Sequence, residues 1–282
     1  MRFKKVYVEI NNTCNFNCSF CIHTERKKEL MSIEKFSHII NEIKDYTEYI
    51  YLHIMGEPLL HPNLNDFVNI CKNNNLKVNI TTNGSLLKKK KDILVNNPIR
   101  QINISLHSIE KEDETFYEYI KDVLDVVDEI LEKTDTYISL RLWNVEDENN
   151  SRQDYILKTL SDIYNVSLDS IELKNYRSIT IRKNLFLSMD RRFIWPSLKN
   201  EVFSLTGRCK GLKEMCGILV DGTVVPCCLD AQGDINLGNI FKDSFKTILD
   251  NKRTKNILEG WNKNTCSELL CKKCSYRGRF GL

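Results

Sequence analysis

The sequence lacks the features that place a chain in a membrane or carry it across one. No apolar run approaches the ~18 residues that a transmembrane helix requires. The N-terminus is charged and then alternates apolar with polar residues, without the apolar stretch of about 7–15 residues that marks a signal peptide. We therefore expect a cytoplasmic protein with no membrane partner, in which thiols stay reduced.

A surplus of either charge is also missing. The 282 residues contain 41 Lys and Arg against 38 Asp and Glu, which gives a net charge of +3. This balance creates no long-range field that would attract nucleic acid, so we expect no nucleic-acid partner. Hydrophobic residues make up 41% of the chain, which is typical of a globular protein with a substantial core.

Cysteine is the residue type that the chain holds in unusual number. The chain has 11 cysteines, and an odd total leaves at least one thiol outside any set of disulfides. In a cytoplasmic protein, patterned cysteines more often bind metal or take part in catalysis than form disulfides. We therefore expect metal ligation.

Hydrophobic periodicity predicts strands that alternate with helices as far as residue 173. The expected strands cover residues 6–10, 49–54, 77–81, 101–106, 137–142 and 170–173. The expected helices cover residues 33–43, 64–71, 88–95, 113–132 and 155–164, with Ser32 placed to cap the first of them. This alternation is typical of a parallel sheet with helical crossovers. The predicted fold class is therefore α/β, as a partial (βα)6 TIM-like barrel.

The pattern lapses over residues 180–206, which we interpret as a linker. Beyond Cys209 the chain changes to short strands and glycine turns, and this part holds seven of the eleven cysteines. We therefore expect a core domain over residues 1–190 and a small cysteine-rich α+β domain over residues 191–282.

Three cysteines follow the first expected strand at the spacing C-x3-C-x2-C. They are Cys14, Cys18 and Cys21. A 4Fe-4S cluster normally takes four cysteine ligands, so three leave one iron open for a substrate or cofactor. A zinc site closes at four ligands and needs one more, for which His23 is near enough. Spacing alone leaves both alternatives open.

Four further cysteines near the C-terminus can complete a second site. Asp221-Gly222 predicts a tight hairpin turn that brings Cys209 and Cys227 to one end. The Cys271-x2-Cys274 pair then closes the site from the other side. Two distant cysteine pairs also describe a zinc ribbon, which stays open as an alternative.

The first motif, with the aromatic Phe20 before its last cysteine, resembles that of the radical S-adenosylmethionine (radical SAM) superfamily. The resemblance implies that Cys14, Cys18 and Cys21 hold a 4Fe-4S cluster that binds S-adenosylmethionine, with Phe20 near the adenine. It covers roughly residues 5–180.

Further segments resemble the family's later motifs in the same order. Met55-Gly56-Glu57-Pro58 is similar to the "GGEP" motif, which implies that Gly56, Glu57 and Pro58 bind the cofactor's methionine amino group. Residues 81–84 match the "TNG" segment and residues 103–108 resemble "ISLDS". The latter implies that Ser105 lies near the ribose or the methionine carboxylate. Arg141, at the end of an expected strand, suits a carboxylate because its fork pairs in a bidentate manner.

The C-terminal segment resembles the SPASM/twitch auxiliary-cluster domains. Cys209, Gly222, Cys227, Cys271 and Cys274 meet their signature C-x9–15-G-x4-C followed by C-x2-C. The resemblance implies one auxiliary 4Fe-4S cluster held by the four cysteines. Three others remain as possible alternative ligands: Cys216, Cys228 and Cys266. Cys71, on an expected helix, is interpreted as a buried structural thiol.

The two resemblances together imply a radical SAM oxidoreductase. Such an enzyme reductively cleaves S-adenosylmethionine and uses the 5′-deoxyadenosyl radical to take a hydrogen atom from its substrate. We expect a net oxidation, by dehydrogenation or cross-linking, of a peptide or a small molecule. A low-potential donor such as flavodoxin or ferredoxin would supply electrons. The alternatives are a peptide epimerase, with Cys216 or Cys228 as hydrogen donor, and a non-enzymatic zinc or iron–sulfur protein.

Overall fold

The computed structural model describes residues 2–145, 150–168 and 178–280. The chain divides into two compact units, and we treat each one separately. Unit 1 comprises residues 1–78 and 193–282, and unit 2 comprises residues 79–192. The predicted α/β class, with a mainly parallel sheet and a cysteine-rich C-terminal region, is confirmed.

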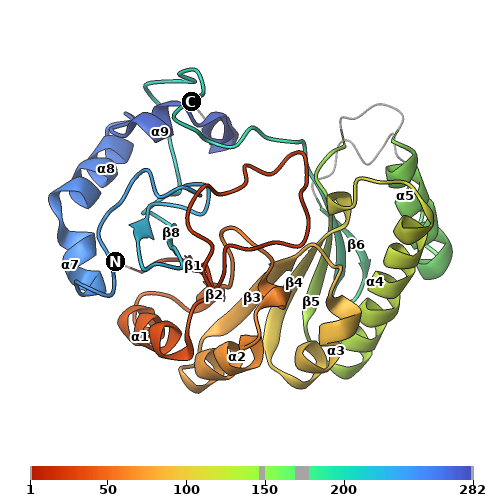
Figure 1. Cartoon of the computed structure of the whole chain (residues 1–282). Helices are drawn as coiled ribbons and strands as arrows, with labels where there is room; N and C mark the ends of the chain where they lie inside the picture. The colour runs from red at the N-terminus through yellow and green to blue at the C-terminus, as the bar shows by residue number, and fades with distance from the viewer. Residues whose placement is uncertain (1, 146–149, 169–177, 281–282) are drawn as a thin grey trace. The chain divides into compact units, whose positions relative to one another are not determined.

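Unit 1 combines both ends of the sequence around β1. Its strands lie in the order β2-β1-β8-β9, in which β1 is parallel to β2 and β8 and β9 runs antiparallel to β8. The strands are β1 (Lys5–Val8), β2 (Tyr49–Tyr51), β8 (Met215–Ile218) and β9 (Val224–Val225). The helices are α1 (Ile33–Ile43), η1 (Pro58–Leu60), α2 (Leu64–Asn73), α7 (Phe245–Asp250), α8 (Lys252–Asn262), α9 (Leu269–Lys272) and η3 (Ser275–Phe280). Figure 1 shows them in red to orange and in blue.

The helix cap, the buried helix face and the hairpin turn predicted for unit 1 are confirmed. Ser32 caps α1, and its side chain accepts a hydrogen bond from the backbone N–H of Lys35 at 3.2 Å. The apolar stripe of α1, which consists of Phe36, Ile39, Ile40 and Ile43, is buried. At the hairpin between β8 and β9, Gly222 has a φ of +87°, which a side-chain-bearing residue adopts only with strain.

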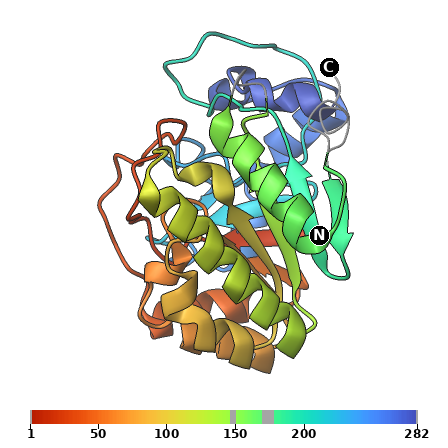
Figure 2. The ribbon, with the colours of Figure 1, turned by 90° about the vertical axis from the view of Figure 1, so that its right-hand side faces the viewer.

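Unit 2 is a run of strand–helix crossovers. Its strand order is β3-β4-β5-β7-β6, with β5 parallel to β4 and β7 and with β6 antiparallel to β7. The strands are β3 (Lys77–Thr82, whose first two residues belong to unit 1), β4 (Ile99–Ser105), β5 (Tyr137–Leu142), β6 (Ser178–Arg182) and β7 (Leu185–Met189). The helices are α3 (Leu87–Asn96), η2 (Leu106–Ser108), α4 (Glu114–Lys133) and α5 (Ser151–Tyr164). Figure 2 shows α3, α4 and α5 along the outside of these strands.

The predicted linker over residues 180–206 is wrong at its beginning. Residues 178–189 form the hairpin β6–β7, in which Ile179 pairs with Leu187. The turn uses Asn184 at a φ of +63°, a conformation that asparagine tolerates. The two strands are short and only β7 is well buried, so their period-2 alternation gave little signal. The strand expected over residues 170–173 lies outside the described residues.

Within the described residues, no helix is both long and apolar enough to cross a membrane. The longest of those helices, α4, has 20 residues, but charged side chains cover its outer face.

We predict that Ser32→Ala lowers the free energy of unfolding by about 1 kcal/mol, because α1 loses its capping acceptor. Urea denaturation of the apo-protein measures the change. Ser37→Ala, in the middle of the same helix, is the matched control and should cost nothing, since alanine is the better helix former there. Equal losses in the two variants would contradict the capping role.

Candidate functional site

The first three cysteines lie on the irregular segment between β1 and α1. Cys14 is exposed, Cys18 is buried and Cys21 is half-buried. The backbone N–H of Cys21 donates to the carbonyl of Cys18 at 3.1 Å, and the N–H of Phe16 points to the Cys14 sulfur at 3.4 Å. Burial raises the pKa of Cys21, so a bound metal would have to deprotonate this thiol. Phe20, between two of the cysteines, is half-buried.

The turn after β2 is joined to this cysteine loop by backbone contacts. Gly56 has a φ of +79°, and a Cβ placed on it would lie 2.7 Å from the carbonyl oxygen of Asn11 and 2.8 Å from that of Thr13. The N–H of Glu57 donates to the Thr13 carbonyl at 2.8 Å. The Asn11 side chain donates to the Glu57 carbonyl at 3.0 Å. The structure therefore brings Gly56, Glu57 and Pro58 to the cysteine loop.

The Glu57 side chain is hydrogen-bonded to a backbone N–H group. Its carboxylate is buried and accepts a hydrogen bond from the N–H of Leu59 at 3.0 Å, which caps η1. Pro58 stands at the first position of that helix, where its missing N–H costs nothing.

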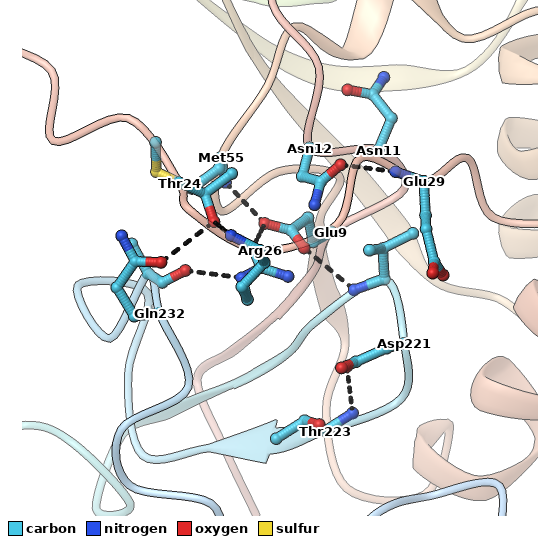
Figure 3. Close-up of polar contacts among 12 residues, drawn as sticks. Glu9, Asn11, Asn12, Thr24, Arg26, Glu29, Met55, Asp221, Thr223 and Gln232 are labelled. Carbon is cyan, nitrogen blue, oxygen red and sulfur yellow. Dashed lines mark hydrogen bonds and ion pairs between the residues drawn. The ribbon is translucent and has the colours of Figure 1, made fainter.

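A buried ion pair holds the base of the cysteine loop (Figure 3). Glu9, which is fully buried, pairs with Arg26 at 2.6 Å. The same carboxylate accepts hydrogen bonds from the N–H groups of Met55 at 3.1 Å and Val220 at 3.0 Å. Burial raises the pKa of Glu9, while Arg26 and the two N–H groups lower it. One carboxylate thus connects the cysteine loop, the Gly56 turn and the β8–β9 turn.

A glutamine from the C-terminal part of the chain forms hydrogen bonds with the same loop. The side-chain oxygen of Gln232 lies 3.2 Å from both the Thr24 hydroxyl and the Glu25 N–H, and its NH2 group donates to the His23 carbonyl at 3.1 Å. Beside it, the Arg26 Nε donates to the Ala231 carbonyl at 2.9 Å. Residues 23–26 are therefore fixed by residues 231–232.

The zinc alternative at the first motif depended on His23. One ring nitrogen of His23 lies 3.1 Å from the carbonyl oxygen of Cys18, so the ring is engaged with the backbone. Throughout residues 2–145, 150–168 and 178–280, no three Cys, His, Asp or Glu side chains converge on a point that could hold a single ion. A cube-shaped cluster attaches its cysteines to separate iron atoms and does not require the thiols to converge on one point.

In unit 2, the structure pairs the two remaining predicted site residues. Ser105 and Arg141 lie directly opposite each other where β4 and β5 end. The Arg141 guanidinium packs over the Trp143 ring at 4.7 Å. A polar cavity of about 260 Å³ extends from Arg141 along the same sheet face. Its other lining residues are Arg100, Gln101, Asn103, Tyr137, Ile138, Ser139, Ser178, Phe186 and Ser188.

His107 follows β4 at a position where the related motif has aspartate. Its ring is parallel to that of Trp143, with centroids 6.5 Å apart, and its Nδ1 lies 3.1 Å from the Arg141 carbonyl. Burial lowers the pKa of His107 to about 4; the hydrogen bond opposes this and the Arg141 charge adds to it. The imidazole is therefore neutral at pH 7.

The predicted second set of cysteines also comes together. Gly211 separates Cys209 from Cys227: a Cβ on this glycine would lie 3.6 Å from the Cys209 sulfur and 3.7 Å from the Cys227 Cβ. Burial raises the pKa of Cys227 and of Cys271 well above the ordinary range, and the neighbouring thiol of Cys209 raises both further. The Cys274 N–H donates to the Cys271 carbonyl at 3.3 Å.

Two donors beside this set fit a sulfur-rich anionic group. The N–H of Gly211 points to the Cys209 sulfur at 3.3 Å. The Trp261 ring lies 6.0 Å from the guanidinium of Arg277, and its buried Nε1 has no hydrogen-bond partner among the described residues. Four crowded thiols with raised pKa values are costly as thiolates unless a metal core neutralises them. The donor set therefore fits an iron–sulfur cluster.

The other cysteines occupy different surroundings. Cys216 is fully buried in β8, where it is shielded from any substrate, and burial raises its pKa. Cys228 is half-buried beside the Tyr7 hydroxyl, which is hydrogen-bonded to it. Cys266 is buried beside Arg277. Cys71 is buried in α2, as predicted.

Several residues that build the two sites could not be found from the sequence. They are Glu9, Asn11, Arg26, Gln232 and Arg277. Arg26 and Gln232 lie 205 and more residues from some of their partners, so no local pattern connects them. Arg277 follows the last cysteine by three positions, and this spacing is its only signal.

Comparisons with known families agree with the two cysteine motifs. The model of the radical SAM superfamily matches residues 8–160. The model of SPASM, an iron–sulfur cluster-binding domain, matches residues 209–275. The two matches imply 4Fe-4S clusters and S-adenosylmethionine as cofactors.

Curated relatives match part of the chain. A GTP 3′,8-cyclase of Staphylococcus aureus is 31% identical over 151 residues, which is 48% of this chain and 42% of that protein. A tungsten-containing aldehyde ferredoxin oxidoreductase cofactor-modifying protein of Pyrococcus furiosus is 34% identical over 88 residues, or 30% of this chain and 25% of that protein. The chain thus spans less than half the length of these relatives.

Solved structures match nearly the whole chain. BtrN in complex with AdoMet and 2-DOIA has a TM-score of 0.63 at 18% identity, covering 98% of this chain and 94% of that one. The anSMEcpe enzyme with AdoMet and the Cp18Cys peptide has a TM-score of 0.57 at 12% identity, covering 96% and 86%. At these identities the likeness shows the fold.

We predict that Arg26→Met lowers the free energy of unfolding of the apo-protein by about 3–5 kcal/mol, because it leaves the Glu9 carboxylate buried without its partner. Urea denaturation at pH 7 measures the loss. The double variant Glu9→Gln/Arg26→Met should lose less than Arg26→Met alone. Lys27→Met, at an exposed neighbouring side chain, is the control. The single variant Glu9→Gln completes the comparison. If the loss of unfolding free energy in the double variant equals the sum of the losses in the two single variants, the pairing is contradicted.

We predict that stability falls as pH drops from 6.5 to 4, in part through His107. The unfolded chain protonates this imidazole near pH 6.5 and the folded chain only near pH 4, so the unfolded state binds more protons between these values. The contribution is at most about 1.4 kcal/mol per pH unit. Denaturation of His107→Gln at several pH values should show a shallower slope; parallel curves for both proteins would exclude the effect.

Proposed function

Because the chain belongs to the radical SAM superfamily and is a SAM-dependent enzyme, we propose that it is an oxidoreductase that abstracts a hydrogen atom from its substrate. When bound, the clusters and S-adenosylmethionine supply an electron and a 5′-deoxyadenosyl radical, and the substrate loses a hydrogen atom, then an electron and a proton. The observation that carries the proposal is the cysteine loop, whose first residues, Asn11 and Thr13, contact the Gly56 turn. This arrangement offers three ligands and a backbone surface for a cofactor.

The roles in unit 1 follow from this arrangement. Cys14, Cys18 and Cys21 hold the cluster that binds S-adenosylmethionine. Gly56 and its neighbours bind the methionine amino group through backbone carbonyls, while the Glu57 carboxylate accepts a hydrogen bond from the Leu59 N–H. The absence of a Cβ at residue 56 allows the turn to lie against the loop. Phe20 contributes its aromatic surface to the adenine.

In unit 2, Ser105 and Arg141 bind the ribose and the carboxylate of the cofactor. Their opposition on β4 and β5 supports a joint role, since a hydroxyl and a guanidinium can contact neighbouring groups of one ligand. Trp143 packs against the Arg141 guanidinium and restricts its orientation.

The auxiliary cluster is proposed to have Cys209, Cys227, Cys271 and Cys274 as ligands, within a domain over residues 191–282 that follows a core over residues 1–190. Mutual crowding of these four thiols supports the assignment. With four cysteine ligands, such a cluster would have no open iron for the substrate and would supply a site that accepts the substrate's electron. The net reaction is then an oxidation.

The substrate class is a peptide or a small molecule. Related folds act on both kinds: BtrN was solved with 2-DOIA and anSMEcpe with a peptide. BtrN matches almost end to end, which favours a small molecule. The polar lining of the cavity beside Arg141 suits a ligand with hydroxyl or anionic groups. A low-potential donor such as flavodoxin or ferredoxin supplies the electrons, and the cytoplasmic location stays a prediction.

We predict that the anaerobically reconstituted protein holds about eight irons, as two 4Fe-4S clusters, and forms 5′-deoxyadenosine from S-adenosylmethionine and dithionite. Cys18→Ala should reduce 5′-deoxyadenosine to the level found without protein, because the cluster loses one of its three ligands. Chromatography of the quenched reaction measures the product. Cys71→Ala is the matched control, since this buried cysteine lies in α2 and should leave the yield unchanged.

Two results would contradict the proposal. Equal yields from Cys18→Ala and the parent would show that the motif does not carry the chemistry. Zinc in place of iron after anaerobic purification would support the non-enzymatic alternative.

A further inference from the structure

Arg277 is a fully buried cation beside the second set of cysteines. Its side chain is 1% exposed and lies in η3, three residues after Cys274. Its Nε donates to the Cys271 carbonyl at 2.7 Å, and its two terminal nitrogens donate to the carbonyls of Thr206 at 3.0 Å and Ser204 at 2.9 Å. A guanidinium keeps its proton at any pH at which the protein is folded. The positive charge is therefore permanent and removed from water.

The described part of the chain provides no carboxylate for this charge. All three carbonyl acceptors are neutral, and no Asp or Glu among the described residues forms an ion pair with Arg277. Arg26, whose side chain is also largely buried, differs because it pairs with the Glu9 carboxylate. A buried charge without a partner is strongly unfavourable, so buried cations normally face an anion.

Sulfur atoms are the remaining candidates for that anion. Arg277 lowers the pKa of the Cys266 thiol, against the larger effect of burial that raises it. Its charge lowers the pKa of Cys209, Cys271 and Cys274, against the larger effect of burial that raises them. Three of the four proposed ligands of the auxiliary cluster therefore lie within its electrostatic reach.

We propose that Arg277 is the counter-charge of the auxiliary cluster and raises the cluster's reduction potential. The inference rests on the ligand assignment under the proposed function. Arg277 acts through the cluster and is thus a positioning residue rather than a catalytic one.

The direction of the effect follows from charge. A 4Fe-4S cluster held by four thiolates is a net anion, and reduction adds one more negative charge. A cation buried nearby stabilises the reduced form more than the oxidised form, and low dielectric strengthens the effect. In the proposed reaction the substrate radical gives up one electron and one proton; the cluster gains the electron and solvent takes the proton. A raised potential makes that electron transfer more favourable.

The test uses the full chain with Cys14, Cys18 and Cys21 replaced by alanine, so that only the auxiliary cluster assembles. Redox titration followed by electron paramagnetic resonance then measures its midpoint potential without overlap. Three further substitutions are compared in this parent. Arg277→Met removes the charge at similar length, Arg277→Lys retains it, and Arg279→Met removes a half-buried arginine from the same helix as a control.

We predict that Arg277→Met lowers the midpoint potential by at least 59 mV, which is a tenfold change in the ratio of reduced to oxidised cluster for a one-electron couple. Arg277→Lys should stay closer to the parent than to Arg277→Met, because the charge remains. Arg279→Met should match the parent. Equal potentials in Arg277→Met and the parent would overturn the inference.

Iron and sulfide content keeps the test decisive if a variant fails to assemble its cluster. Loss in Arg277→Met with retention in Arg277→Lys supports the counter-charge, since only the charge separates the two. Loss in both overturns it, because the forked hydrogen bonds to the carbonyls would then be the essential feature. If the parent with the three alanines does not contain about four irons, the ligand assignment and this inference are both overturned. Cleavage of S-adenosylmethionine by the full enzyme is measured separately and does not depend on this result.

Discussion

The organisation of unit 1 depends on the need to satisfy one buried carboxylate. Glu9 directly follows β1, is removed from water, and finds its partners in Arg26, Met55 and Val220. Each partner belongs to a different segment, and an ionised carboxylate without them would be highly unfavourable. The irregular cysteine loop has no helix or strand of its own to define its course. Its geometry is instead imposed by this carboxylate, by the close contact at Gly56 and by Gln232.

The two arginines of the sites show two ways to place a positive charge inside a protein. Arg26 is neutralised within the chain, so the base of the cysteine loop is electrostatically complete before any cofactor binds. Arg277 has carbonyl and sulfur neighbours but no carboxylate among the described residues. The buried charge of Arg277 is therefore balanced only when the neighbouring thiols carry negative charge. This difference makes the second site the one whose stability should depend on the metal.

Features with a local physical cause could be predicted from the sequence. The cap at Ser32, the stripe of α1 and the turn at Gly222 each depend on residues within a few positions of one another. The cysteine motifs could also be predicted, because the spacing of their cysteines along the chain limits which residues can be ligands. The hairpin β6–β7 was missed because its strands are short and β6 is largely exposed. Contacts such as Gln232 to Thr24 depend on tertiary structure and leave no trace in a single sequence.

The hydrogen bonds between residues 231–232 and residues 23–26 determine when the cysteine loop can reach its final geometry during translation. Roughly 200 residues must be added after Arg26 before Gln232 exists, which takes about 10–40 s at ordinary rates of synthesis. During that interval the nascent cysteine loop has neither its glutamine nor the Val220 N–H that helps to hold Glu9. The loop reaches its final geometry only after translation of the C-terminal part, so iron delivery to a preformed loop is a post-translational event.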